Sequence, residues 1–317
     1  MVSLFGLDPA TYRPHPVHSG DRSYLETNCY ADIVVELLHA RGDEPLAGMA
    51  FLVRTDFEGD QFSFFKPPPG DLEALYGVDI HEMQPFRPLP AQMAEQLADG
   101  RTIIVELDAW YLPDTAATSY GREHVKTSVA IEGIDRDAER LRYFHNAGLH
   151  ELSGSDYRGA LRLDGGLDGH VLPPYTEIAR FDAGPRLEGD ALRDCAHGLL
   201  RHHLARRPGG NPFARFGAAL TADLPELLAG DDAHYHANAF ATVRMAGSAS
   251  ELLASHADWL LGEAGAQPAA ALRRVVEGCK VLSFRLARRR SFDPDPIVSA
   301  MAVAWDEGLA GLHAAAR

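Results

Sequence analysis

The chain has 317 residues, of which 46% are hydrophobic and 24% charged, a globular composition with length enough for two domains. The formal net charge of −15 argues against a nucleic-acid partner, because phosphate binding requires a basic surface. No segment approaches the roughly 18 consecutive apolar residues of a membrane helix, and residues 1–10 lack the basic and apolar regions of a signal peptide. We therefore expect a soluble cytoplasmic protein with no nucleic-acid or membrane partner.

The first part of the chain, residues 1–185, mixes helix and strand signals. An extended lead-in precedes Cys29–Ala40, where apolar residues recur at helical spacing. A second short helix is expected at 90–98, ending near a glycine. Strands are predicted at 49–54, 61–66, 102–107, 125–134 and 140–146. This part is therefore predicted to be an α+β domain.

The amino-acid composition changes after Pro185. Ala, Leu, Arg and Glu dominate, and runs of β-branched residues almost vanish. The patterns predict helices at 188–206, 213–228, 234–245, 249–261, 269–287 and 296–315. We therefore expect residues 186–317 to form a second, all-helical domain.

Three cysteines lie far apart and without CxxC spacing, which argues against a disulfide framework. Cys195 and Cys279 fall inside amphipathic helical patterns and are expected in the core. Cys29 stands at a helix start, where free N–H groups and the macrodipole stabilise a thiolate and can hold an oxyanion. It is a candidate nucleophile, and a small buried core residue is the alternative.

A thiol nucleophile needs a base, and His124 opens the strand predicted at 125–134. The next predicted strand ends in His145-Asn146, either of which could orient the imidazole. Strand alternation places the two on opposite faces, so only one can serve, and Asn146 is preferred. Cys29, His124 and Asn146 are thus the candidate catalytic set.

Three segments carry a resemblance: Asn28-Cys29-Tyr30 before a helix, Asp108–Pro113, and His124 before a strand that ends at Asp135. Together they make the stretch 27–146 similar to the N-terminal domain of the butirosin-type acyltransferases. These form a papain-like group related to the bacteriocin-processing cysteine peptidases. The complete chain resembles the bacterial family DUF1839, whose members tend to be encoded near carrier proteins and the ligases that load amino acids onto them.

The resemblance implies a papain-like catalytic domain over residues 1–185 and an acyltransferase activity. An acyl or aminoacyl group would pass from the phosphopantetheine thioester of a carrier protein, through Cys29, to an amine acceptor. His124 would be the base and Asn146 the orienting group, and no cofactor beyond the partner's phosphopantetheine is implied. Papain-like peptidases usually carry Gln six residues before the cysteine. Here that residue is Ser23, so Asn28 is the candidate substitute in the oxyanion hole.

Other residues near these segments are candidates for binding substrate. Asp108 ends a predicted strand, and its carboxylate could bind the α-amine of an aminoacyl group or of the acceptor; a solvated strand end is the alternative. Trp110 and Tyr111 could line the same pocket, and core packing is the alternative. The basic run Arg285–Arg290 could dock an acidic carrier protein, or it is a solvated helix end.

Histidine pairs at 202–203 and at 234 and 236 raise the question of a metal site. Residues at i and i+2 do not share a helix face, and no HExxH or CxxC motif is present. We expect no metal.

Three functions remain open at this point. The leading one is a ping-pong acyltransferase. A papain-like peptidase or amidase differs by admitting water as the second nucleophile. A non-catalytic module would use the same cleft to bind a carrier protein or a peptide.

Overall fold

The computed structural model describes residues 1–20, 22–163 and 172–317, and these fold into two compact units. The first unit comprises residues 1–16, 29–45 and 69–186. The second unit comprises residues 17–28, 46–68 and 187–317. Two early segments of the chain thus belong to the unit that the C-terminal helices form.

The first unit is built around one sheet. Its strands are β1 (Val2–Ser3), β2 (Asp79–Glu82), β3 (Thr102–Asp108), β4 (Lys126–Asp135), β5 (Arg140–His145), β6 (Gly148–Ser153) and β7 (Thr176–Arg180). They lie in the order β2-β7-β3-β4-β5-β6, with β1 paired to β4. Every pairing among them is antiparallel.

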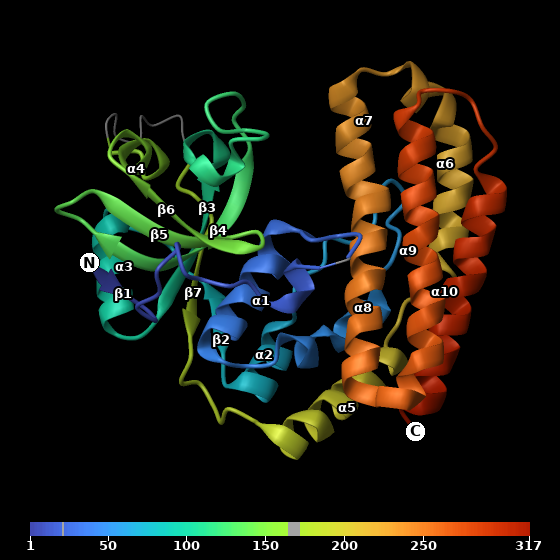
Figure 1. Ribbon diagram of the computed structural model, residues 1–317, viewed down its shortest axis with the longest axis horizontal. Helices are drawn as coiled ribbons and strands as arrows, with labels where there is room; N and C mark the ends of the chain where they lie inside the picture. Colours follow the sequence, from blue (N-terminus) through green and yellow to red (C-terminus); the bar gives the residue numbers. More distant parts are fainter. Residues whose placement is uncertain (21, 164–171) are drawn as a thin grey trace. The chain divides into compact units, whose positions relative to one another are not determined.

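Helices cover both faces of this sheet. They are α1 (Cys29–Arg41), α2 (Pro69–Tyr76), α3 (Leu89–Ala98) and α4 (Ser155–Ala160), with short 3₁₀ turns η3 (Ala109–Tyr111) and η4 (Pro113–Thr115). In Figure 1, α3 lies to one side of the sheet and α1 to the other. α3 and α4 bury one face in a core that includes Ile103, Val105 and Leu107 of β3. Because strand residues alternate, Glu106 and Asp108 point toward the α1 face.

The second unit is helical. It contains α5 (Gly189–Ala205), α6 (Pro212–Ala229), α7 (Asp232–Ala239), a π-helical turn η5 (Phe240–Arg244), α8 (Met245–Leu261), the 3₁₀ turn η6 (Gly262–Gly265), α9 (Ala266–Ala287) and α10 (Asp295–Ala315). The long helix α9 packs against both α8 and α10, and α6 packs against α10 (Figure 1). Most of the 3₁₀ helix η2 (Pro45–Arg54) also belongs to this unit.

The predicted mixed class of the first part and the helical second part are confirmed. The helix predicted at 29–40 is α1, and the helix predicted at 90–98 is α3. The six predicted C-terminal helices are present, although the one at 234–245 is divided between α7 and the π turn. Helical periodicity is a strong signal over such lengths, which is why these elements were recognisable.

The strand pair predicted at 49–54 and 61–66 is wrong. Residues 45–54 form the 3₁₀ helix η2, and the following segment contributes only an isolated bridge between Phe57 and Phe62. Met49, Leu52 and Val53 are all buried. A short run that is apolar on every side has no period by which strand and helix can be told apart.

Several short elements were missed. The helix α2 was not predicted; it begins at Pro69, as helices often do, because proline suits the first helical position. The short strands β2 and β7 pair with each other at the edge of the sheet. The strand predicted at 140–146 ends at His145, and a two-residue turn, with Asn146 at φ 46°, leads into β6.

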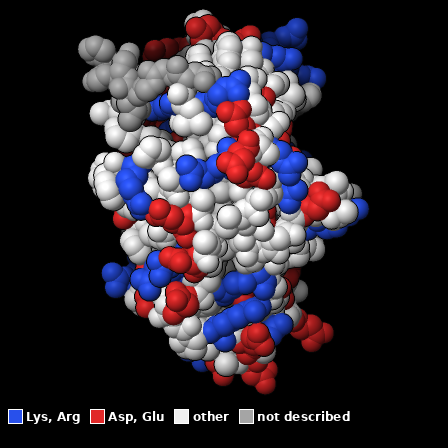
Figure 2. Space-filling model, turned by 90° about the vertical axis from the view of Figure 1, so that its left-hand side faces the viewer, with Lys and Arg blue, Asp and Glu red and all other residues white. Residues whose placement is uncertain are grey.

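None of the helices in the described part of the chain combines the length and apolarity that a bilayer crossing requires. Figure 2 shows one face of the molecule, on which acidic and basic side chains are interspersed around an uncharged central area. The negative net charge is therefore not gathered into a single acidic field on this face.

Candidate active site

Cys29 is the first residue of α1 and is half-buried. The apolar side of α1 that follows, including Ile33 and Val34, is buried in the first unit, where α1 packs against β4 and β5. The positive end of the helix macrodipole lies at this thiol. The predicted helix-start position of the thiol is confirmed.

The residue after the cysteine ties the start of α1 to the edge of the sheet. Tyr30 hydrogen-bonds to Glu177 of β7 and lies near Tyr175. Burial, together with the Glu177 carboxylate, raises the pKa of the Tyr30 hydroxyl, so the phenol stays protonated. The backbone of Tyr175 in turn accepts a hydrogen bond from Glu106 of β3, 3.0 Å away. Cys29 thus begins a helix anchored beside the end of β3.

The end of β3 carries a histidine–aspartate pair. Nδ1 of His124 lies 2.6 Å from Oδ2 of Asp108. The other carboxylate oxygen of Asp108 accepts a hydrogen bond from the Trp110 backbone, at 3.0 Å. The indole of Trp110 stacks on the imidazole, with ring centroids 4.5 Å apart and planes 11° apart. The carboxylate and the indole together hold the imidazole in one orientation.

Local sequence explains this geometry. Asp108 is the last residue of β3 and caps the 3₁₀ turn that follows it. In register it faces Lys126, the first residue of β4, and the Ala109 backbone donates to the Val125 carbonyl. Residue 124 therefore returns to the sheet beside Asp108.

The pair faces solvent. The His124 side chain is 67% exposed and that of Asp108 is 28% exposed. No hydrogen-bond partner occupies Nε2 of His124 among residues 1–20, 22–163 and 172–317. An imidazole whose Nδ1 is held by a carboxylate and whose Nε2 is accessible can take and return a proton.

A pocket of about 460 Å³ opens at this pair, and we call it the dyad pocket. It is lined by residues 106–108, 124–126, 162 and 172–175. Lys126 forms an ion pair with Glu106, with 2.7 Å between Nζ and Oε1. Tyr175, the neighbour of Tyr30, forms part of the wall. The walls of the dyad pocket therefore include His124, Asp108 and a neighbour of Tyr30, the residue that follows Cys29.

A second pocket of about 400 Å³ adjoins it, and we call it the proline pocket. It is lined by residues 85–89, 106–108, 160–163 and 173–174. Residues 106–108, Arg162 and the pair Pro173-Pro174 line both pockets. The two cavities thus adjoin at the aspartate and share part of their walls.

Asn146, the residue predicted to orient His124, makes no hydrogen bond to it within the described residues. It is the first residue of the β5–β6 turn, and its left-handed backbone is one that asparagine tolerates. Nδ1 of His124 contacts Asp108 instead. Strand alternation does not apply to Asn146, because β5 has already ended.

His145, the alternative third residue, is buried in a network of its own. Its Nδ1 lies 2.5 Å from Oδ2 of Asp114, and its Nε2 lies 2.8 Å from the Thr127 hydroxyl. The Tyr143 hydroxyl donates to the other oxygen of Asp114 at 2.5 Å. Burial raises the pKa of Asp114, but the hydrogen bond and charge of His145 outweigh it, so the pKa lies below its usual value. This pair holds the turn η4 against the sheet.

The remaining expected site residues have structural contacts. The Asn28 amide, in the second unit, donates to the Phe65 carbonyl at 3.1 Å. A Cβ placed on Gly159 of α4 would come within 2.2 Å of the Tyr111 ring, so that ring packs against α4. Ser23, six residues before the cysteine, donates its backbone N–H to Glu251. Trp110 supports the imidazole, as described above.

The other two cysteines differ in burial. Cys279 lies in the core of the second unit, as predicted, and burial raises the pKa of its thiol. Cys195, on α5, is half-buried. An elevated pKa leaves little thiolate at neutral pH, so Cys279 is expected to be inert.

The histidine pairs and the basic run 285–290 were the other candidate binding features of the sequence. No group of three or more His, Cys, Asp or Glu side chains in the described part of the chain is arranged to hold a metal ion. In the basic run, Arg289 donates to the carbonyls of Leu227 and Gly230, and Arg288 stacks 4.1 Å from the Phe284 ring centroid. Arg289 therefore serves to close α6.

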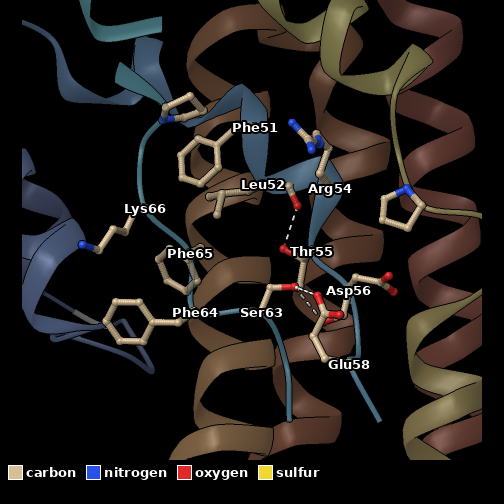
Figure 3. A pocket seen from close by; sticks show the side chains of 12 residues that line it. Phe51, Leu52, Arg54, Thr55, Asp56, Glu58, Ser63, Phe64, Phe65 and Lys66 are labelled. Carbon is tan, nitrogen blue, oxygen red and sulfur yellow. Dashed lines mark hydrogen bonds between the residues drawn. The ribbon is translucent and has the colours of Figure 1, made fainter. Parts of the chain in front are cut away.

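The second unit has a pocket of its own, of about 310 Å³. Figure 3 shows Phe51, Phe64 and Phe65 lining it together with Arg54 and the Ser63–Glu58 hydrogen bond. Its described lining contains no cysteine and no histidine. It offers neither of the groups that a thiol-dependent site requires.

The role of Asp108 as the partner of His124 was missed at the level of sequence. A signal was present, because Asp108 ends one strand and His124 begins the next along the chain. Antiparallel neighbours bring such residues to the same edge. The intervening 15 residues concealed that adjacency.

Comparison with known families assigns the whole chain. Residues 13–181 match the DUF1839 N-terminal domain and residues 189–314 match the DUF1839 C-terminal domain. No curated protein matches the chain. The chain belongs to the DUF1839 family.

Proposed function

We propose that this protein is a cysteine-dependent acyltransferase whose nucleophile is Cys29 and whose base is His124. The observation that carries the proposal is the oriented pair of His124 and Asp108, exposed at a pocket whose wall includes Tyr175, a neighbour of Tyr30 in α1. Asp108 takes the orienting role first expected of Asn146. A thiol, an imidazole and a carboxylate acting in series form the arrangement that activates a cysteine.

The chemistry begins with transfer of the Cys29 proton to Nε2 of His124. The thiolate attacks the carbonyl carbon of the donor thioester, and the positive end of the α1 macrodipole stabilises the oxyanion. The donor carbon–sulfur bond breaks, and the leaving thiol takes the proton from His124. The product is an acyl-Cys29 thioester.

The second half-reaction regenerates the enzyme. The acceptor amine attacks the acyl-Cys29 carbonyl while His124 removes a proton from its nitrogen. Collapse of this intermediate breaks the bond to the cysteine sulfur and forms an amide. His124 then returns the proton to Cys29, which completes a ping-pong cycle.

We also propose that the first unit has a papain-like fold. It is supported by a helix that begins with the cysteine and packs on an antiparallel sheet. It is also supported by a histidine two residues before the first residue of β4. The acyl donor proposed with it is a carrier protein bearing a phosphopantetheine thioester, and the acceptor is a small or amino-acid-derived amine.

A hydrolase is a second candidate, because the His124 side chain is 67% exposed. Water reaches an imidazole of that exposure without hindrance and could resolve the acyl-enzyme in place of an amine. The same nucleophile and base would then perform peptidase or amidase chemistry.

The test is intact-protein mass spectrometry after mixing the protein with aminoacylated and acylated carrier proteins. A gain of one acyl group that hydroxylamine removes is the expected result. Cys29→Ala is expected to abolish the gain and to retain its fold, and Cys279→Ala serves as the matched control that still gains the group.

The outcomes separate the candidates. Rapid loss of the acyl group in buffer without amine would favour a hydrolase. Persistent acyl-enzyme that an amine discharges would support a transferase. Equal acylation of Cys29→Ala and wild type would overturn the assignment of the nucleophile.

A further inference from the structure

We propose that the proline pocket binds the apolar part of the transferred acyl group, so that the site selects large aliphatic or aromatic acyl groups over glycyl or acetyl. This inference rests on the proposed function, because it places the carbonyl of the same group between Cys29 and His124. It adds the substrate class that the proposed function leaves open.

Continuity with the dyad pocket is the first argument. Asp108, which holds His124, lines both cavities, as do Leu107 and Arg162. A group that extends from the imidazole along Asp108 therefore reaches residues that also line the proline pocket.

The chemistry of the lining is the second argument. Prolines at 85, 88, 173 and 174 contribute rings but no backbone N–H, so these walls offer few hydrogen-bond donors. Leu89, Leu107 and Leu161 add aliphatic surface. The volume of about 400 Å³ falls within the range of pockets that hold small molecules. Such a lining favours hydrocarbon over polar groups.

Exposed apolar side chains at this pocket are the third argument. Phe86 is 83% exposed and Leu163 is 42% exposed. Large exposed hydrophobic residues that cluster beside a cavity mark a surface that is covered when ligand binds. A hydrocarbon group in the pocket would cover part of this surface.

The walls are held in place before any ligand enters. Arg87 forms two parallel hydrogen bonds to Glu95 of α3, at 2.9 and 2.6 Å, which fasten the loop 85–89. Leu161 belongs to the buried core that α4 shares with the sheet. Arg162 donates to the Leu172 carbonyl at 2.8 Å where the two pockets meet. A preformed pocket costs little ordering on binding.

Most charged side chains where the two pockets meet are paired with one another. Lys126 is paired with Glu106, and His124 is paired with Asp108. Arg162, which lines both pockets, donates to the Leu172 carbonyl. The polar groups at the junction are therefore each held by a partner, and the apolar surface remains the feature that distinguishes one acyl group from another.

The experiment uses acetyl-, butyryl-, hexanoyl- and octanoyl-pantetheine, with the rate of Cys29 acylation followed by intact-protein mass spectrometry. Each buried methylene is expected to raise the second-order rate constant about fourfold, which corresponds to ~0.8 kcal/mol per methylene. A rate constant that is flat or falls with chain length would overturn the proposal.

A variant pair locates the effect. Leu163→Asp is expected to reduce octanoyl transfer at least ~10-fold more than acetyl transfer, because it places a carboxylate beside the bound chain. Val281→Asp, on α9 and equally exposed at 43%, is the matched control and should leave the chain-length dependence unchanged. Equal chain-length dependence in Leu163→Asp and wild type would contradict the assignment to this pocket.

Failure of the proposed function gives a different result. If no thioester acylates Cys29, the proposed function fails, and the pocket is tested by titrating the Cys29→Ala variant calorimetrically with the same thioesters. Octanoyl-pantetheine is then expected to bind at least ~10-fold more tightly than acetyl-pantetheine. Equal affinities, or no binding of either, would overturn the pocket as well.

Discussion

Two histidine–aspartate pairs lie at the same end of the sheet in the first unit, and they differ mainly in burial. Nδ1 of His124 is 2.6 Å from Asp108, and Nδ1 of His145 is 2.5 Å from Asp114. The side chains of the first pair are 67% and 28% exposed, and those of the second are 2% and 8% exposed. Similar contacts thus sit in opposite environments.

The second ring nitrogen separates their functions. Nε2 of His145 meets the Thr127 hydroxyl at 2.8 Å, whereas Nε2 of His124 borders a pocket. An imidazole with both nitrogens engaged can stabilise a fold but has no site left for a substrate proton. A catalytic histidine requires one nitrogen held and one accessible. Proximity to an aspartate therefore does not by itself identify a catalytic base.

Strand geometry explains why the two pairs diverge. His145 and Thr127 point to the face that α3 and α4 cover, together with Tyr143 and the buried core. Asp108 points to the opposite face, where α1 packs. One step along a strand changes the environment of a side chain from core to pocket.

The largest expected effect is on activity at the exposed pair. Asp108→Asn should lower the rate of Cys29 acylation by up to ~10⁴-fold, because an amide does not hold the imidazole in the required tautomer. Its free energy of unfolding should change by less than ~1 kcal/mol, because the pair is exposed. Acylation kinetics and urea denaturation measure the two quantities.

The matched control for this variant is Asp79→Asn. It removes the carboxylate of another exposed pair, in which Oδ2 of Asp79 lies 3.0 Å from Nδ1 of His81. Acylation should be unaffected. A similar loss of rate in both variants would show that Asp108 has no specific role.

The buried pair should show the reverse result. Asp114→Asn is expected to lower the free energy of unfolding by ~3–5 kcal/mol, because it removes one partner of a buried, hydrogen-bonded pair. Denaturant unfolding of this variant, compared with Asp108→Asn, gives the difference directly. Equal stability of the two variants would remove burial as the distinction between the pairs.

His256 is a third buried or paired histidine, and its Nδ1 contacts a backbone carbonyl and not a carboxylate. Burial lowers the pKa of His256 to about 4, and its Nδ1 lies 2.7 Å from the Leu46 carbonyl. The unfolded chain takes up this proton near pH 6.5 and the folded chain only near pH 4. Stability should therefore fall between these values, by on the order of 3 kcal/mol.

Unfolding free energies at pH 7 and pH 4 measure this dependence. His256→Gln should show a smaller difference between the two pH values than the wild type, whatever its stability at pH 7. An unchanged difference would indicate that other groups account for the loss of stability in acid.

The smallest expected effect concerns a pair that is mostly exposed. Lys126, 69% exposed, lies 2.7 Å from Glu106, which is 24% exposed. Lys126→Met should change the free energy of unfolding by less than ~1 kcal/mol, because solvent and salt screen the attraction. A loss comparable with that of Asp114→Asn would contradict the ranking by burial, and thermal unfolding in low and high salt provides the check.

Local patterns were enough to predict the helical second part, the start of α1 at Cys29 and the strands β3, β4 and β5. The helices repeat the 3.6-residue period over many residues, and the strands are rich in β-branched or aromatic residues. The sequence also identified Cys29 and His124 as candidates, since each stands at the beginning of an element. Their chemistry depends on local position, which the sequence contains.

The remaining features of the fold and of the site depend on tertiary packing. The run 49–53 is buried on all sides and lies in a 3₁₀ helix, a condition that no local pattern records. The choice of Asp108 as the partner of His124 depended on pairing between β3 and β4 across a long connection. Asn146 was expected to orient His124, but β5 ends one residue before it, and Asn146 lies in the turn that follows. Which side chains meet, and which of them water can reach, follows from how distant segments pack.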